Sequence, residues 1–439
     1  MRERSAAGVW AVRARAWPML AALAWLVGGC SAPPRPDPGA WCPMLPSATG
    51  PGPAPVPPSP TGPRATTGAG TTSATAAAGP SLRRQIEHNF AERLAVKRAA
   101  ARPTAPPPGR PVVTPAPTPA PSPEAYSVLV LSAGGQTGAY GAGFLKGWGD
   151  RGDLQPDRSQ IDMITGVSTG AMMATFAYLG SSSNPRTRAQ FDAALEAQYT
   201  ELRDEDVFRK RGIVEMLWSN SVYDTQPLWT RIGELVSDAL LDAVVAEADE
   251  TRRLMFVGAV NADSGEFEVF DLVALARDRS PQRRACYTAA ILASAAIPGA
   301  FEPVFINGRM YIDGGARRNV FFVQEVGAAL PGVDKHLFGI MHADLSPSTQ
   351  TTRNHLVGVV SRTASLAMDE LVLDAAYRVD AEASRLGFAT HWTSASQVSC
   401  PSGGGMFDPQ KGRCLWATGL ARARDAAQPW KAFSEIDRP

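Results

Sequence analysis

The distribution of proline separates a part of this chain that can fold into a domain from a part that cannot. Of its 37 prolines, 24 lie between residues 32 and 125, among Ala, Thr, Gly and Ser, and only 12 follow. A segment of this composition buries too little apolar surface to offset the chain entropy lost on folding. We therefore expect a Pro-rich disordered tether at residues 30–125 and one folded domain at residues 126–439.

One stretch of the Pro-rich region has a helical pattern. Within residues 81–100, Ile86, Phe90 and Leu94 follow one another at intervals of four, with charged residues between them. This spacing places the three apolar side chains on one face of a helix. The pattern leaves two roles open, because such a helix can dock on a membrane or other surface or pack on the folded domain.

The first residues resemble an export signal. Residues 1–29 contain four arginines and then a short apolar run at 16–27, which is too short to span a bilayer as a mature helix. The sequence VGGC at 27–30 resembles the lipobox of bacterial lipoproteins, which implies acylation of Cys30 and a lipid-anchored envelope protein. Ser31 in place of Asp favours the outer membrane by the same resemblance. An ordinary signal peptide with a chance cysteine is the alternative.

Charge and cysteine spacing restrict the function classes. The net charge is +1, so no strong field favours nucleic acid. Cys400 and Cys414 flank a Gly-rich segment and are a possible disulfide, whereas Cys286 lies in an apolar helix-like run and is expected to be a buried free thiol. No clustered His/Cys spacing supports a metal site, structural or catalytic.

A glycine-rich turn joins the first expected strand to a helix. Residues 127–131 are apolar, residues 132–138 read SAGGQTG, and residues 139–148 are helix-like. This geometry exposes backbone N–H groups at a helix N-terminus, where they bind anions. A Walker lysine and a Gly-x-Gly-x-x-Gly pattern are both absent. An oxyanion hole and a simple tight turn therefore remain as interpretations.

A second strand, turn and helix follow. The strand-like residues 161–165 lead into GVSTG at 166–170, which matches the nucleophile elbow Gly-x-Ser-x-Gly. Gly166 and Gly170 remove Cβ atoms where the chain turns sharply. The pattern therefore predicts that the Ser168 hydroxyl is exposed above the sheet as a nucleophile.

The third element is MYIDGG at 310–315, a strand that ends at Asp313 and is followed by Gly314 and Gly315. A carboxylate at this place can accept the proton of a serine hydroxyl. By itself, Asp313 is equally compatible with an ordinary turn residue.

Together, in this order, the three elements resemble the patatin-like phospholipases over about residues 126–330. The resemblance implies an α/β fold of three layers, α/β/α, with a central, mostly parallel sheet. It implies a Ser-Asp dyad in which Ser168 is the nucleophile and Asp313 the general base. The N–H groups around Gly134 and Gly135 would form the oxyanion hole, and no cofactor is implied.

The expected function is that of a lipid acyl hydrolase of the phospholipase A or lysophospholipase type, with membrane lipid as substrate. A generic carboxylesterase or an acyltransferase on the same site is the nearest alternative. A non-catalytic envelope lipoprotein is another. An α/β-hydrolase with a Ser-His-acid triad is a third, and His342 follows a strand-like run where a triad histidine could stand.

Overall fold

The fold is seen in a computed structural model, which describes residues 42, 79–100, 125–151, 157–216, 218–345, 351–401, 403–425, 427 and 429–436. The expected signal peptide, Cys30 and most of the Pro-rich region lie outside these residues. Within the described ranges, no helix combines the length and the apolar character needed to cross a membrane.

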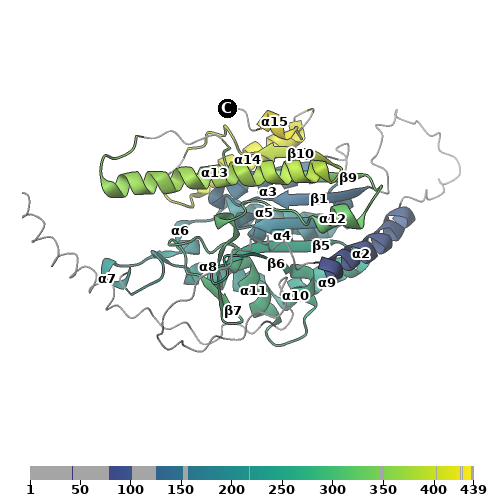
Figure 1. The fold of residues 1–439 in the computed structure, drawn as a ribbon, viewed down its shortest axis with the longest axis horizontal. Coiled ribbons are helices and arrows are strands. Elements are labelled where there is room, and N and C mark those ends of the chain that lie inside the picture. Colours follow the sequence, from purple (N-terminus) through teal and green to yellow (C-terminus); the bar gives the residue numbers. More distant parts are fainter. Residues whose placement is uncertain are drawn as a thin grey trace, which may run out of the picture.

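An eight-stranded sheet forms the centre of the described domain, with the strand order β10-β9-β1-β2-β5-β8-β7 and with β6 also paired to β5 (Figure 1). The strands from β10 to β5 pair in parallel, and the pairings of β6, β7 and β8 are antiparallel. The strand bounds are β1 Tyr126–Leu131, β2 Met163–Val167, β5 Leu254–Asn261, β6 Phe267–Asp271, β7 Val304–Ile306, β8 Arg309–Asp313, β9 Lys335–Met341 and β10 Phe388–Ser394. A separate two-stranded sheet pairs β3 (Arg209–Lys210) with β4 (Tyr223–Asp224).

Helices cover both faces of the sheet, because strand side chains alternate between the faces. In β1, Leu129 and Leu131 belong to one apolar cluster, and Val128 and Val130 belong to the other. The helices on the first face are α3 Gly138–Asp150, α4 Thr169–Leu179, α5 Pro185–Thr200, α6 Asp204–Val207, α8 Gln226–Leu235, α9 Asp238–Thr251, α10 Leu272–Arg277, α11 Arg283–Ser294 and α14 Pro409–Asp425. Those on the second face are α2 Gly79–Ala100, α12 Glu325–Ala329, α13 Leu356–Arg385 and α15 Phe433–Ile436. The predicted three-layer α/β/α fold is confirmed.

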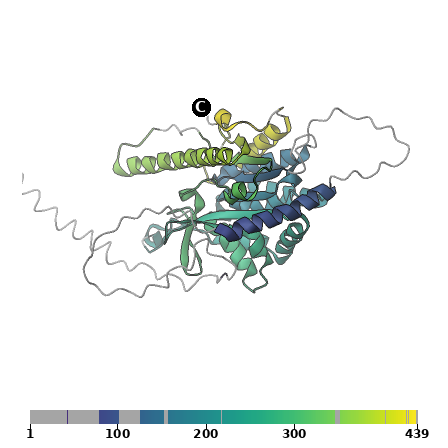
Figure 2. The ribbon, with the colours of Figure 1, turned by 45° about the vertical axis from the view of Figure 1, so that its right-hand side comes forward.

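The helix expected at residues 81–100 is α2, which packs on the domain (Figure 2). Its Ile86 and Phe90 side chains are buried in the second apolar cluster. One and two turns further on, Arg93 and Lys97 both bind the Asp162 carboxylate, at 2.9 and 2.7 Å. Of the two roles that the sequence leaves open, the structure therefore shows packing on the folded domain.

The expectation that Cys286 is a free thiol is wrong, because Cys286 forms a disulfide with Cys42. The side chain of Asn307 holds the same cysteine: the Cys42 N–H donates to Asn307 Oδ1 at 2.7 Å, and Asn307 Nδ2 donates to the Cys42 carbonyl at 3.1 Å. A separation of 244 residues leaves no local signal of this pairing. Cys400 and Cys414 also form a disulfide.

Candidate active site

Ser168 lies at the sharp turn between β2 and α4, where it is the N-cap residue of the helix. Its backbone has φ 53° and ψ −119°, a conformation that costs energy for a residue with a Cβ. The flanking glycines permit the turn: a Cβ on Gly166 would lie 2.4 Å from the Gly170 carbonyl oxygen, and one on Gly170 would lie 2.3 Å from that of Leu131. The sequence thus needs glycine on both sides to hold Ser168 at this position.

The strained turn at Ser168 is supported by a second serine. The Ser168 N–H donates to Ser294 Oγ at 3.0 Å, and the Ser294 hydroxyl donates to the Gly258 carbonyl at 2.6 Å. Ser294 is fully buried at the end of α11. The spacing of Ser294 in the sequence carries no sign of this contact.

Asp313 ends β8 beside Ser168, because β8 pairs with β5 and β5 pairs with β2. Its carboxylate accepts a hydrogen bond from the Gly315 N–H at 2.7 Å. Burial raises the pKa of Asp313 to about 6, and hydrogen bonding from the Ser168 side chain and the Gly315 N–H opposes this rise only in part. The structure therefore brings together the two residues that the sequence placed 145 positions apart.

The glycine-rich loop lies on the other side of Ser168. Gly134 precedes a 3₁₀ turn, η1 (Gly135–Thr137), and Gly135 has φ 57°. The first N–H groups of a helical turn have no partner within it, so those of Gly135 and Gln136 can point to a ligand. Gly135 and Gln136 line the same pocket as Ser168.

No histidine is hydrogen-bonded to Ser168, although all five histidines lie in the described ranges. His342 is fully buried, and its Nδ1 donates to the Ser132 carbonyl at 2.6 Å. Burial lowers the pKa of His342 to about 4. Its Nε2 lies against Gly141, where a Cβ would approach within 2.1 Å. His342 therefore packs beneath α3 and supports the loop, which disfavours a Ser-His-acid triad.

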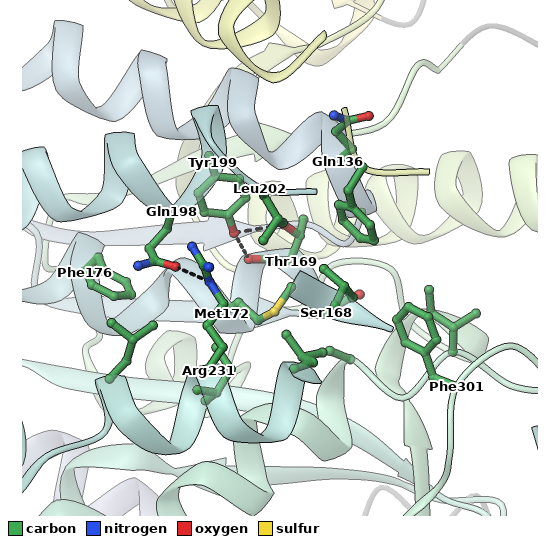
Figure 3. A pocket seen from close by; sticks show the side chains of 18 residues that line it. Gln136, Ser168, Thr169, Met172, Phe176, Gln198, Tyr199, Leu202, Arg231 and Phe301 are labelled. Atoms are coloured by element: carbon green, nitrogen blue, oxygen red, sulfur yellow. Dashed lines mark hydrogen bonds between the residues drawn. The ribbon is translucent and has the colours of Figure 1, made fainter. Parts of the chain in front are cut away.

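An apolar pocket begins at Ser168 and runs between α4, α5 and α8 (Figure 3). The polar side chains in its wall have partners within the protein: the Tyr199 hydroxyl donates to the backbone carbonyl of Thr169 at 2.8 Å, and Arg231 Nε donates to Gln198 Oε1 at 2.9 Å. The apolar wall includes Met172, Phe176, Leu228, Ile232, Ile297 and Phe301. The mostly apolar lining of this pocket suits an acyl chain whose carbonyl lies at Ser168.

The sequence does not predict that several of these residues line the pocket. Leu228, Arg231 and Ile232 come from α8, which the sequence does not connect to the elbow. An amphipathic helix predicts only that one of its faces is buried, and not that this face lines a cavity. Among the described residues, no group of three or more His, Cys, Asp or Glu side chains is placed to hold a metal ion.

The fold and the elbow define an α/β protein with a serine presented at a strand-to-helix turn. The profile of the patatin-like phospholipase family matches residues 129–324, a range that contains the glycine-rich loop, Ser168 and Asp313. Residues 129–324 are thus similar to the patatin-like phospholipases, and this similarity supports lipid ester hydrolysis as the class of activity. No curated protein matches the chain in sequence.

Two solved structures show partial similarity. VipD from Legionella pneumophila is 13% identical, with a TM-score of 0.29, and the match covers 68% of this chain and 66% of that one. A chain of the heterodimeric ExoU–SpcU complex from the type III secretion system of Pseudomonas aeruginosa is also 13% identical, with a TM-score of 0.24, and the match covers 60% of this chain and 52% of that one. The similarity to the patatin-like phospholipases rests on the sequence match over residues 129–324.

Proposed function

We propose that this protein is a serine lipid acyl hydrolase, of phospholipase A or lysophospholipase type, which uses Ser168 and Asp313 as a catalytic dyad. The observation that supports it best is the juxtaposition of a strained elbow serine, a buried carboxylate without a cationic partner among the described residues, and an apolar pocket. The three features supply a nucleophile, a base and an acyl-chain site.

In the first step, Ser168 Oγ attacks the ester carbonyl carbon while Asp313 accepts the hydroxyl proton. The carbonyl electron pair moves to oxygen, and the N–H groups of the loop at Gly134 and Gly135 stabilise the resulting oxyanion. Collapse of this intermediate breaks the ester C–O bond, and the proton on Asp313 passes to the departing alcohol. An acyl group then remains on Ser168.

In the second step, water attacks the acyl-enzyme and Asp313 removes its proton. Collapse releases the fatty acid and returns the proton to Ser168. A pKa of about 6 keeps Asp313 mostly ionised at neutral pH, yet basic enough to share in proton transfer. The dyad chemistry needs no cofactor.

The test is hydrolysis of a phospholipid panel by wild type and by Ser168→Ala, with products weighed by mass spectrometry. Ser183→Ala is a matched control, since Ser183 is exposed and outside the pocket. We expect Ser168→Ala to be folded and inactive, and an active-site fluorophosphonate to label wild type and Ser183→Ala at Ser168. Labelling that persists in Ser168→Ala contradicts the proposal.

The same panel separates the alternatives. Hydrolysis of a short soluble ester without attack on vesicles favours a generic carboxylesterase. Acyl transfer to an added alcohol acceptor favours an acyltransferase. A well-folded wild type that is neither active nor labelled favours a non-catalytic envelope lipoprotein.

We also propose that Cys30 carries a lipid anchor in the outer membrane. The described residue nearest to it, Cys42, is fixed to α11 by its disulfide. The twelve chain steps from 30 to 42 reach at most about 43 Å. Residues 43–78 lie between two attachment points on the domain, Cys42 and α2, and add nothing to this reach.

The anchor is tested with Cys30→Ser. We expect this variant to lose incorporation of labelled palmitate and to leave the membrane fraction more readily than wild type. Unchanged palmitate labelling in Cys30→Ser shows that the acylated residue is a different one.

A further inference from the structure

Exposed large apolar side chains gather on two segments of the described chain. The first is the finger, residues 209–224, made of β3, α7 (Ile213–Met216) and β4. Here Val214 is 74% exposed and Trp218 is 60% exposed. The second is the free half of α13, Leu356–Met368, where Leu356 is 80% exposed and Val360 is 58% exposed. Exposed apolar side chains concentrated in this way mark an interaction surface.

Topology places the free half of α13 on the active-site edge of the sheet. Helix α13 precedes β10, which is parallel to β9, β1 and β2, so the helix starts at the edge where β2 ends and Ser168 begins. Its 30 residues span about 45 Å, whereas the seven residues of β10 span about 23 Å. The C-terminal half packs on the sheet through Ala376 and Val379, and the N-terminal half projects beyond it (Figure 1).

The finger is attached to the rim of the apolar pocket. The N–H groups of Val222 and Tyr223 donate to the carbonyls of Gly299 and Ala300, at 2.9 and 3.0 Å. The next residue, Phe301, lines the pocket. Figure 1 shows α7 and the free half of α13 at the same end of the molecule. Both segments therefore border the side from which a substrate reaches Ser168.

The chemistry of the two segments is apolar and basic. In the free half of α13, Leu356, Val359 and Val360 have the i, i+3, i+4 spacing of one helix face. Residues 351–368 contain Arg353 and Arg362 but no Asp or Glu. The finger begins with the exposed side chains of Arg209 and Lys210, and the acidic side chain of Glu215 within it is paired with Arg211. Apolar side chains interspersed with cations, and a Trp among them, suit the anionic interface of a bilayer.

We propose that the finger and the free half of α13 form a docking surface for an anionic lipid bilayer, which brings the mouth of the pocket to the lipid. That the substrate is a lipid is taken from the function proposed above, and the docking surface rests on it in this respect. Continuity with an apolar pocket for acyl chains favours a lipid surface over a protein partner. An acyl chain then passes from bilayer to Ser168 along apolar side chains.

The test uses the chain from Ser31 onward, which keeps every described residue and removes the candidate anchor. Vesicles of phosphatidylglycerol and phosphatidylcholine are sedimented with wild type, Trp218→Ser and Leu356→Ser/Val360→Ser. Tyr377→Ser is the matched control, because Tyr377 is 47% exposed but lies on the packed half of α13 against Phe433. All are repeated in a Ser168→Ala background, so that binding is measured independently of hydrolysis.

We expect at least tenfold weaker vesicle binding when the Trp218 and α13 changes are combined, with a smaller loss for each alone. Hydrolysis of a short soluble ester should stay within twofold, because these side chains do not line the pocket. Tyr377→Ser should bind as wild type does. Higher salt should weaken wild-type binding.

A second measurement does not depend on removing side chains. Val360→Cys carrying an environment-sensitive fluorophore should shift to shorter wavelength when vesicles are added. If the labelled protein sediments with vesicles but its fluorescence does not shift, the proposal is overturned. Unchanged vesicle binding when the Trp218 and α13 changes are combined also overturns it. Wild-type dimers that the same substitutions separate, without vesicle binding, instead identify the surface as a contact between two copies.

Discussion

Asp162 and Asp313 are both buried aspartates, and they lie at opposite edges of the same sheet. Asp162 directly precedes β2, and its carboxylate accepts hydrogen bonds from Arg93, from Lys97 and from the Ser127 N–H. Asp313 is the last residue of β8, where it pairs with Ala259 near the end of β5, next to Ser168. Among the described residues, Asp313 has no cationic partner, and burial raises its pKa to about 6.

The partners of a buried carboxylate decide whether it forms a structural ion pair or favours the uptake of a proton. Two cations and an N–H satisfy Asp162, so this carboxylate fastens α2 to the domain. No cation among the described residues pairs with Asp313, so burial favours the protonated form of this carboxylate. One edge of the sheet thus holds a carboxylate that fastens a helix to the domain, and the other holds the carboxylate that we propose as the general base.

The largest expected difference between the two residues is in turnover. Asp313→Asn should lower kcat by about a hundredfold to ten-thousandfold, because it removes the proposed general base. Asp162→Asn, measured under conditions where it is folded, should keep kcat within about twofold, since Asp162 is remote from the pocket. The measurement is initial rate on one ester, with circular dichroism for folding. An active Asp313→Asn protein would remove Asp313 from the mechanism.

How much of this site the sequence predicts depends on how local each signal is. The elbow and the Asp313-Gly314-Gly315 turn are short patterns with a direct backbone meaning, so both were predicted with the fold. Their contact depends on β8 pairing beside β5, which the family resemblance supplied and the residues alone did not.

Long-range contacts were not predictable. The pairing of Cys42 with Cys286 joins the Pro-rich region to α11, and the ion pairs of Asp162 join α2 to the start of β2. The periodicity of α2 predicts a buried face but not the surface that covers it. For the same reason α2 resembled a docking helix, whereas the exposed apolar face belongs to the first half of α13.

The next expected difference is in stability. Replacing Asp by Asn should lower the free energy of unfolding at position 162 and raise it at position 313. Asp162→Asn leaves two buried cations without their carboxylate and should lower the free energy of unfolding by about 3 kcal/mol. Asp313→Asn removes a buried charge without a cationic partner among the described residues. It should raise the free energy of unfolding at pH 8, by an amount on the order of 1–3 kcal/mol.

Denaturant unfolding of both variants at pH 8 measures this pair of effects. If Asp313→Asn destabilises the protein as much as Asp162→Asn does, the two carboxylates have equivalent environments.

A third difference is in pH dependence. Because Asp313 must be ionised to act as base, kcat/KM should fall as pH falls through about 6, and at pH 5 it should be about tenfold below its value at pH 8. The raised pKa also means that the folded state binds the Asp313 proton more tightly than the unfolded state. The stability linked to Asp313 is therefore present at low pH and is lost as pH rises from about 4 to 6.

The pH profile is measured as kcat/KM on a soluble ester between pH 4.5 and 8.5, with Asp162→Asn as the matched control. The control should keep the same midpoint near 6. A wild-type midpoint at or below pH 4 contradicts the assignment of Asp313 as the titrating base.

The smallest expected effect separates the two cations on Asp162. Arg93 also donates to the Ser159 carbonyl at 2.6 Å, and Lys97 also donates to the Ala125 carbonyl at 2.8 Å. Burial lowers the pKa of Lys97, and the attraction of Asp162 offsets this effect only in part. The ion pair with Asp162 therefore stabilises the fold less than its short distance suggests. Lys97→Gln keeps a hydrogen-bond donor and should lower the free energy of unfolding by about 1 kcal/mol. In Asp162→Asn protein the same change should cost less, since the shared partner is gone. Denaturant unfolding of the two single variants and the double variant measures this coupling, and strictly additive losses would show that Lys97 and Asp162 stabilise the domain independently.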